Sequence, residues 1–165
     1  MAQTESINDV RPPAQDVTTL YCLMGEALCM IQHLEEALCH SYTLQLNSKS
    51  PKEQADIVLE KNRSNTLGDA IKFTKKNALY TDSFQMELEV LRVERNWLVH
   101  KIVPYSLDEM YAESSKGKLF DRIRAISKKA YILQQTIEDG MIEFCESAGK
   151  DMSKVRAEIS RLRLL

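Results

Sequence analysis

The chain has 165 residues, of which 44% are hydrophobic and 28% charged, and its formal net charge is −2 at pH 7. This length and composition are those of a single globular domain that can bury a core of its own. No apolar run approaches the roughly 20 residues of a membrane-spanning helix, and the small net charge offers no overall attraction for nucleic acid.

Residues 1–16 are predicted to form a flexible arm, because they are polar, contain a Pro-Pro pair and lack the apolar centre of a signal peptide. The rest of the chain carries four cysteines, at Cys22, Cys29, Cys39 and Cys145. Their spacing contains no Cys-x-x-Cys pair, which favours small buried side chains in a reducing compartment over disulfides or a metal site. We therefore expect a cytoplasmic protein with no metal, no cofactor and no membrane association.

Apolar residues recur every three or four positions from about residue 16 to 46, which predicts a first long helix. Its main seam consists of Leu20, Leu23, Ala27, Met30, Leu34, Ala37, Ser41 and Leu44. Two short crossover helices are predicted next, at about 50–61 and 66–76. Each opens with the residue pattern of a capping box, at Ser50 to Glu53 and at Thr66 to Asp69, and Asn77 is a suitable end for the second helix.

The run from residue 84 to 103 predicts a central helix, capped by Thr81 and Asp82, with two separate apolar seams. The first seam is Phe84, Leu88, Leu91, Arg95, Leu98 and Ile102. The second seam is Met86, Val90, Val93, Trp97 and His100. A helix with two seams needs two packing partners, so we expect it to lie at the centre of a bundle or to be shared with a second subunit.

One ionisable residue stands in each seam of the central helix, Arg95 in the first and His100 at the end of the second. A buried, unpaired guanidinium is costly, so Arg95 must have a partner, reach water or line a cleft. On the first helix Glu35 is one candidate partner, and Glu36 could serve as well. Such an Arg and His are also commonly a snorkelling surface arginine and a hydrogen-bonded histidine with no function.

The end of the central helix is set by Pro104, which disfavours helical geometry at the residue before it. His100 then falls in the last turn, where the helix dipole favours a protonated imidazole. Asn96 precedes it by four positions and could orient the ring.

Downstream of the central helix, a short helix is predicted from Ser106 to a break near 114–117. The third long helix follows, ending near Gly149, and residues 151–165 form a last amphipathic helix. The seam of the third long helix is Leu119, Ile123, Ile126, Ala130, Leu133, Ile137, Gly140 and Phe144. The predicted fold is all-α: an up-down bundle of three long helices with short crossover helices, in one domain over 17–165 with its core at 17–148.

Basic residues are clustered in two places, although the whole chain is slightly acidic. The first cluster is Arg122, Arg124, Lys128 and Lys129, and the second is Lys154, Arg156, Arg161 and Arg163. Such clusters could steer a phosphate backbone, but acidic residues are interspersed in both, and solvated helix faces are the commoner explanation.

The segment from Arg95 through Asn96 to His100 resembles the motif of the HEPN superfamily: an Arg, often followed by a polar residue, and a His after four to six residues. The resemblance in fold would cover roughly residues 17–148. It implies a homodimer whose paired motifs form a metal-independent endoribonuclease, with Arg95 and His100 catalytic and Asn96 orienting the histidine or binding phosphate. The RNA products would then carry a 2′,3′-cyclic phosphate.

The dimer also follows from the chemistry, because one motif offers a single histidine while cleavage needs a base and an acid. Two central helices facing each other across a two-fold axis would supply two copies of His100 and of Arg95. The second seam is the expected contact surface, with Trp97 as a dimer contact.

Relatives of this kind act as toxins or effectors in bacterial toxin–antitoxin and anti-phage systems, often with an antitoxin of nucleotidyltransferase type. Some carry a tyrosine two residues after the histidine, as the antitoxin's modification target, whereas this chain has Ile102 there. The alternative is a non-catalytic HEPN-like dimer that binds a nucleotide or partner or regulates transcription.

Overall fold

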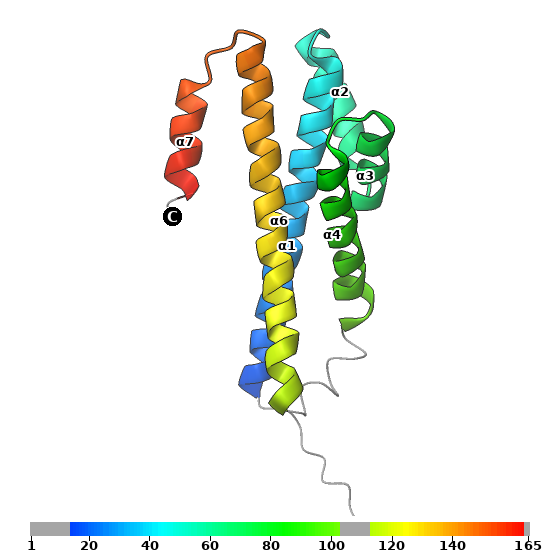
Figure 1. Ribbon diagram of the computed structural model, residues 1–165, viewed down its shortest axis with the longest axis vertical. Coiled ribbons are helices and arrows are strands. Elements are labelled where there is room, and N and C mark those ends of the chain that lie inside the picture. Colours follow the sequence, from blue (N-terminus) through cyan, green and yellow to red (C-terminus); the bar gives the residue numbers. More distant parts are fainter. Residues whose placement is uncertain (1–13, 103–112, 164–165) are drawn as a thin grey trace, which may run out of the picture.

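The computed structural model describes residues 14–102 and 113–163, which are almost entirely helical (Figure 1). The helices are α1 (Ala14–Asn47), α2 (Lys52–Arg63), α3 (Leu67–Lys76), α4 (Asp82–His100), α6 (Glu113–Ser147) and α7 (Ser153–Arg163). No strand occurs within these ranges, so the predicted all-α class is confirmed. None of the described helices is long and apolar enough to cross a membrane.

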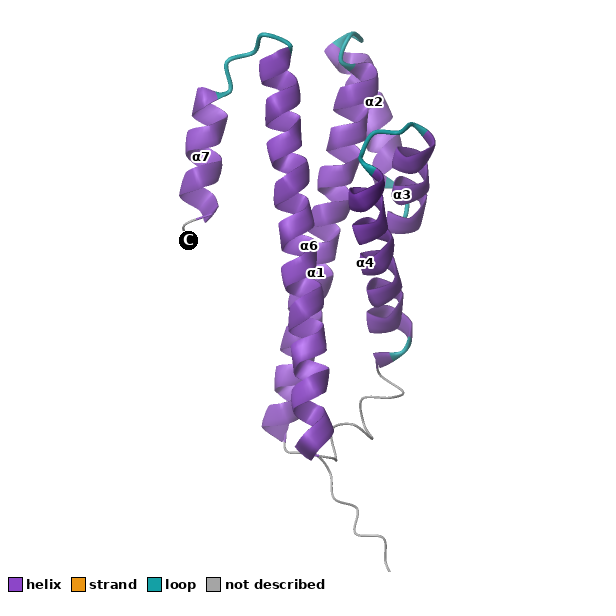
Figure 2. Ribbon diagram, viewed as in Figure 1, coloured by secondary structure: helices purple, strands orange, loops and turns teal. Residues whose placement is uncertain are grey.

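The bundle is built on the two longest helices, α1 and α6, which pack along each other more extensively than any other pair. They run in the same direction, and the shorter α4 runs the opposite way beside them (Figure 1). Helices α2 and α3 make the crossover from the end of α1 to the start of α4, joined by short loops (Figure 2). The long helices therefore alternate in direction along the chain, as an up-down bundle requires.

The core lies where α1, α3, α4 and α6 meet, and it is made of aliphatic side chains. Side chains with at most 2% of their surface exposed include Leu34, Leu38, Ile71, Leu88, Leu91, Leu98, Ile123 and Leu133. Burying each such leucine or isoleucine stabilises the fold by about 1.5–3 kcal/mol before entropy is subtracted. The first seam of α4 contributes to this core, apart from Arg95.

Hydroxyl caps begin α3 and α4, as predicted. Thr66 accepts a hydrogen bond from the Asp69 amide at 3.3 Å, and its hydroxyl donates to the Asp69 carboxylate at 2.7 Å. Thr81 accepts from the Phe84 amide at 3.3 Å. These bonds satisfy amide groups that have no partner inside the helix and so define where each helix starts.

The capping box predicted at Ser50 is not formed. The N-cap position of α2 is held by Pro51, which has no side-chain cap, and Ser50 lies one residue too early to reach the first turn. The Ser50 amide instead donates to the Asn47 carbonyl at 2.9 Å, closing the turn that ends α1. Because the turn after α1 uses the Ser50 amide, that amide is not available to a capping box.

Two helix boundaries differ from the prediction at one end of the bundle. Helix α1 begins at Ala14 rather than after residue 16, and α6 runs through 114–117, where a break was predicted. Lys116 forms an ion pair with Asp16 at 2.9 Å, and both side chains are largely buried. This tertiary contact holds the first turns of both helices together. Most of the short helix predicted from residue 106 lies outside the described residues.

The four cysteines are free, but only Cys39 is buried. The prediction that all of them are small buried side chains is wrong for Cys22 and Cys29, which are exposed on α1. They are seven residues apart, or about two helical turns, and share the face that α1 turns away from its neighbours. Cys145 is half-buried on α6.

Candidate functional site

Arg95 lies on the buried face of α4, between core residues Leu91 and Leu98, and is itself half-buried. Within the described part of the chain its guanidinium forms no hydrogen bond or ion pair. It lines a polar pocket of about 270 Å³ between the start of α3 and the second half of α4. Of the environments predicted for Arg95, the structure shows a cleft.

This polar pocket is defined by the first turn of α3 and by one face of α4. Its lining consists of residues 66–69, Lys72, Arg92, Arg95 and Asn96. The residues from α4 follow one another at intervals of three and one, so they project from the same side of the helix. The pocket thus gathers three cationic side chains and one carboxylate, that of Asp69.

Glu35 approaches Arg95 from α1 without forming an ion pair with it. Burial raises the pKa of the Glu35 carboxyl, and the nearby charge of Arg95 and a hydrogen bond from the Leu67 amide oppose that rise. The other candidate, Glu36, faces away and binds Arg63 and His40. The suggestion that Glu36 pairs with Arg95 is therefore wrong, and Glu35 is an electrostatic neighbour.

The replacement Glu35→Gln is expected to stabilise the protein at pH 7. A carboxyl whose pKa is raised on folding favours the folded state below its usual pKa of 4.5 and loses that advantage as the pH rises through the folded pKa. Glutamine keeps an oxygen for the Leu67 amide but cannot ionise. Urea unfolding at several pH values should show that the free energy of unfolding of the variant rises relative to that of the wild type between pH 4 and 7. A difference in stability that does not change with pH would contradict this account.

His100 is the last residue of α4, as predicted, and its side chain is exposed. It has no hydrogen-bond partner among the described residues, and Asn96 does not orient it in the isolated chain. On an ideal helix His100 lies about 40° from Asn96 and about 140° from Arg95. It therefore stands beside the polar pocket without lining it.

Most of the second seam of α4 faces solvent. Met86, Val90 and Val93 are 70%, 59% and 57% exposed, and we call these three residues the exposed seam. Trp97, the remaining apolar member, is half-buried because the Arg122 guanidinium lies 3.6 Å from the centre of its ring. The residue predicted as a dimer contact thus already packs within its own chain, against α6.

The edge of the exposed seam toward α6 is polar. Glu87 pairs with Lys129, and Glu94 pairs with Arg122 at 2.9 Å, so two ion pairs join α4 to α6 along this edge. Apolar residues bordered by paired charges resemble the centre and rim of a protein interface.

Both basic clusters are largely neutralised by carboxylates. In the first cluster, Arg124 pairs with Asp121, in addition to the pairs of Arg122 and Lys129. In the second cluster, the ion pairs are Arg156 with Glu146, Arg161 with Glu158, and Arg163 with Glu138 and Asp139. Neither cluster therefore forms a continuous cationic surface for a phosphate backbone.

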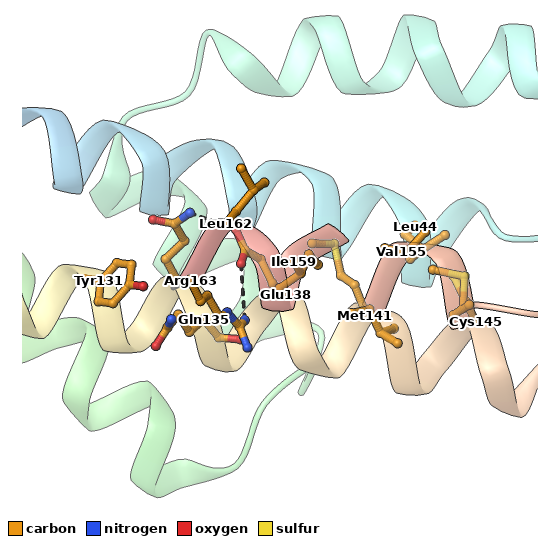
Figure 3. A pocket seen from close by; sticks show the side chains of 13 residues that line it. Leu44, Tyr131, Gln135, Glu138, Met141, Cys145, Val155, Ile159, Leu162 and Arg163 are labelled. Atoms are coloured by element: carbon orange, nitrogen blue, oxygen red, sulfur yellow. Dashed lines mark hydrogen bonds and ion pairs between the residues drawn. The ribbon is translucent and has the colours of Figure 1, made fainter. Parts of the chain in front are cut away.

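A larger cavity, of about 480 Å³, lies between α7, the second half of α6 and Leu44 of α1 (Figure 3). Its walls are mainly apolar, with Met141, Val155 and Ile159 among them. It shares no residue with the polar pocket and contains none of the predicted site residues.

Lys72 and Arg92 of the polar pocket were not identified from the sequence. The capping box at Thr66 marked a helix start, and Arg92 lies one turn before Arg95, but neither pattern says that α3 begins beside α4. That juxtaposition depends on the crossover through α2, which only the folded chain shows.

Neither a metal site nor a relative indicates the chemistry. Over residues 14–102 and 113–163, no three His, Cys, Asp or Glu side chains are grouped so that they could hold a metal ion. Comparison of the chain with protein-family models, curated proteins and solved structures found no match. The functional argument therefore rests on α4, with Arg95 and Asn96 in the polar pocket and His100 at the end of the exposed seam.

Proposed function

We propose that the protein is an endoribonuclease of the HEPN type, which cleaves RNA without a metal ion at a site formed between two copies of α4. The observation that carries this proposal is the exposed seam, an uncovered apolar stripe that ends at His100 on the helix that also bears Arg95. The half-buried guanidinium of Arg95 lines a polar pocket and has no partner among residues 14–102 and 113–163, which supports its role as a binding group for an anion.

A second copy of the chain is the expected partner for the exposed seam. Contiguous exposed apolar side chains commonly mark a protein interface, and a two-fold axis lets the same stripe cover itself. Val93 and His100 are seven residues apart, or about 20° on an ideal helix. Covering the seam would therefore bring the partner chain next to His100 and combine two histidines in one cleft.

The proposed reaction is transfer of the scissile phosphate to the neighbouring ribose oxygen. One copy of His100 takes the proton of the 2′-hydroxyl while that oxygen forms a bond to phosphorus. The other copy gives a proton to the 5′-oxygen as its bond to phosphorus breaks. The products are a 2′,3′-cyclic phosphate and a 5′-hydroxyl. Arg95 would stabilise the negative charge on the phosphate oxygens, and the Asn96 amide would donate a hydrogen bond to them.

Incubating RNA with the purified protein in EDTA tests the proposal. We expect the wild type to cleave, and His100→Ala and Arg95→Ala to lower the rate by about 10² to 10⁴, the usual contribution of acid–base and electrostatic groups. The upstream fragment should be lighter by one water than a linear phosphate. His33→Ala and Arg124→Ala, which alter exposed residues elsewhere, should retain full activity. Equal background cleavage by all five proteins would overturn the proposal.

The same resemblance suggests a toxin or effector role in the cytoplasm, in a bacterial toxin–antitoxin or anti-phage system. An antitoxin of nucleotidyltransferase type could not silence this chain through a tyrosine two residues after His100, because Ile102 stands there and is fully buried. A cognate antitoxin would have to act at another residue or by covering the site.

A non-catalytic dimer that binds a nucleotide or a regulatory partner is the second candidate. The observation that favours it is the pairing of most cations in the two basic clusters, which leaves little surface to attract a long RNA. Binding of RNA or nucleotide in the same assay, without cleavage by any of the proteins, would favour this candidate.

A further inference from the structure

The polar pocket contains four hydrogen-bond donors that the fold does not use. No partner within the described residues engages the Arg95 guanidinium or the two terminal nitrogens of Arg92, whose Nε alone binds Glu89 at 2.6 Å. Lys72 has only a long ion pair with Asp69, at 3.9 Å, and is well exposed. The backbone amide of Gly68, in the first turn of α3, also has no partner in the part of the chain that the structure describes.

The amides on either side of Gly68 each have a hydrogen-bond acceptor, so Gly68 alone of these three offers an amide that is free to bind a ligand. The Leu67 amide donates to Glu35, and the Asp69 amide donates to the hydroxyl of Thr66. A Cβ placed on Gly68 would lie 3.4 Å from Cδ of Arg92, at the limit of comfortable contact. Glycine thus keeps the backbone amide and the arginine within reach of the same small volume.

Donors of this kind match one chemical group best. A phosphate offers several negatively charged oxygens, which accept from guanidinium, ammonium and backbone amide groups at once. The pocket lining has three cations against one carboxylate, Asp69, whose oxygens already accept hydrogen bonds from Thr66. With Glu35 near Arg95 and Glu89 paired with Arg92, three carboxylates balance the three cations in formal charge, so the match to phosphate rests on the free donor groups and not on a net positive charge.

We infer that the polar pocket binds a phosphate group, and that in the ribonuclease it holds a backbone phosphate of the RNA strand beside the one that is cleaved. The assignment of the phosphate to an RNA strand rests on the proposed function. The assignment of a phosphate site to this pocket does not. Lys72, Arg92 and the Gly68 amide are its ligands, and Arg95, which lines the same pocket, serves the neighbouring phosphate that is cleaved.

Binding of an uncleavable RNA tests this inference separately from catalysis. The probe is a fluorescein-labelled 12-nucleotide RNA with 2′-O-methyl riboses, titrated with the full chain at several salt concentrations. Lys72→Gln and Arg92→Gln should each weaken binding about tenfold. Each should also reduce the slope of log affinity against log salt by about 0.7, the loss of one phosphate contact on a single strand.

Three further variants sharpen this result. Gly68→Ala keeps every charge but narrows the pocket, and it should weaken binding without lowering the melting temperature. Glu35→Gln removes a carboxylate behind Arg95 and should strengthen binding. Arg124→Gln, which alters an exposed arginine on α6, is the matched control and should change neither the affinity nor the slope.

A second probe, inorganic phosphate, distinguishes the two sources of the group. Its addition should shift the Gly68 amide signal in ¹⁵N-resolved NMR spectra of the wild type but not of Lys72→Gln. If phosphate shifts this signal and the RNA does not bind, the pocket serves a small phosphate compound and the RNA part of the inference is wrong.

The inference and the proposed function can fail independently. Cleavage that needs His100 but is insensitive to Lys72→Gln and Arg92→Gln, in affinity, salt slope and KM, would overturn the phosphate site alone. RNA binding that falls in both variants, without any cleavage, would uphold the phosphate site and overturn the ribonuclease.

Discussion

The double replacement Val90→Glu and Val93→Glu is expected to convert the proposed dimer into a monomer of 18.9 kDa and to abolish the proposed RNA cleavage. Both side chains are more than half exposed in one chain, so the monomer should fold normally. In a two-fold dimer the two changes place four carboxylates in the interface, and each uncompensated buried charge costs several kcal/mol. Because about 1.4 kcal/mol corresponds to a tenfold change in affinity, the dissociation constant of the dimer should rise by well over a hundredfold.

Light scattering after size-exclusion chromatography measures the mass, and the EDTA assay measures cleavage on the same samples. Ile57→Glu is the control, because Ile57 is 70% exposed on α2, away from the exposed seam, and should leave both mass and activity unchanged. A wild-type protein that is already monomeric would remove the basis for the shared site. A monomeric variant with full activity would show that one copy is sufficient for cleavage.

The replacement Leu98→Ala should destabilise the fold by about 2–5 kcal/mol, the range for truncating a fully buried leucine. Leu98 is 1% exposed and holds the second half of α4 against the core between Arg95 and His100. Its loss leaves a cavity that the packed neighbours can fill only in part. Denaturant unfolding followed by the fluorescence of Trp97, the single tryptophan of the chain, measures the change.

The neighbouring residue provides the control for Leu98. Val99 is 41% exposed, and Val99→Ala should change the free energy of unfolding by no more than about 0.5 kcal/mol. Similar losses for the two variants would mean that α4 does not pack on the core through its first seam.

The sequence by itself determined which segments form the long helices and which residues share one apolar face of each. Spacings of three and four predicted α1, α4 and α6, and the first seam of α4 is buried as its pattern required. Thr66 and Thr81 identified helix starts, because a cap depends on neighbours within one turn. His100 was likewise placed correctly in the last turn of α4.

Local patterns were less reliable wherever another part of the chain competed for the same groups, either the end of the preceding helix or a residue far away in sequence. The Ser50 pattern failed because the end of α1 uses the Ser50 amide, and α6 starts early because Lys116 finds Asp16 about a hundred residues away. The stacking of Arg122 of α6 on Trp97 was not indicated by the sequence either, and it leaves the predicted dimer contact of Trp97 a prediction. The contacts of Lys116 with Asp16 and of Arg122 with Trp97 cannot be read from a window of one or two helical turns.

The tertiary structure decided the composition of the candidate site. A helical pattern places Arg95 on the buried face of α4, but it cannot say what meets that face. The crossover through α2 brings the first turn of α3 there, so that Lys72 and the Gly68 amide join Arg92 and Arg95 around one pocket. Helix periodicity is a local property of the chain, whereas a pocket depends on which elements pack together, and that choice is made by the whole core.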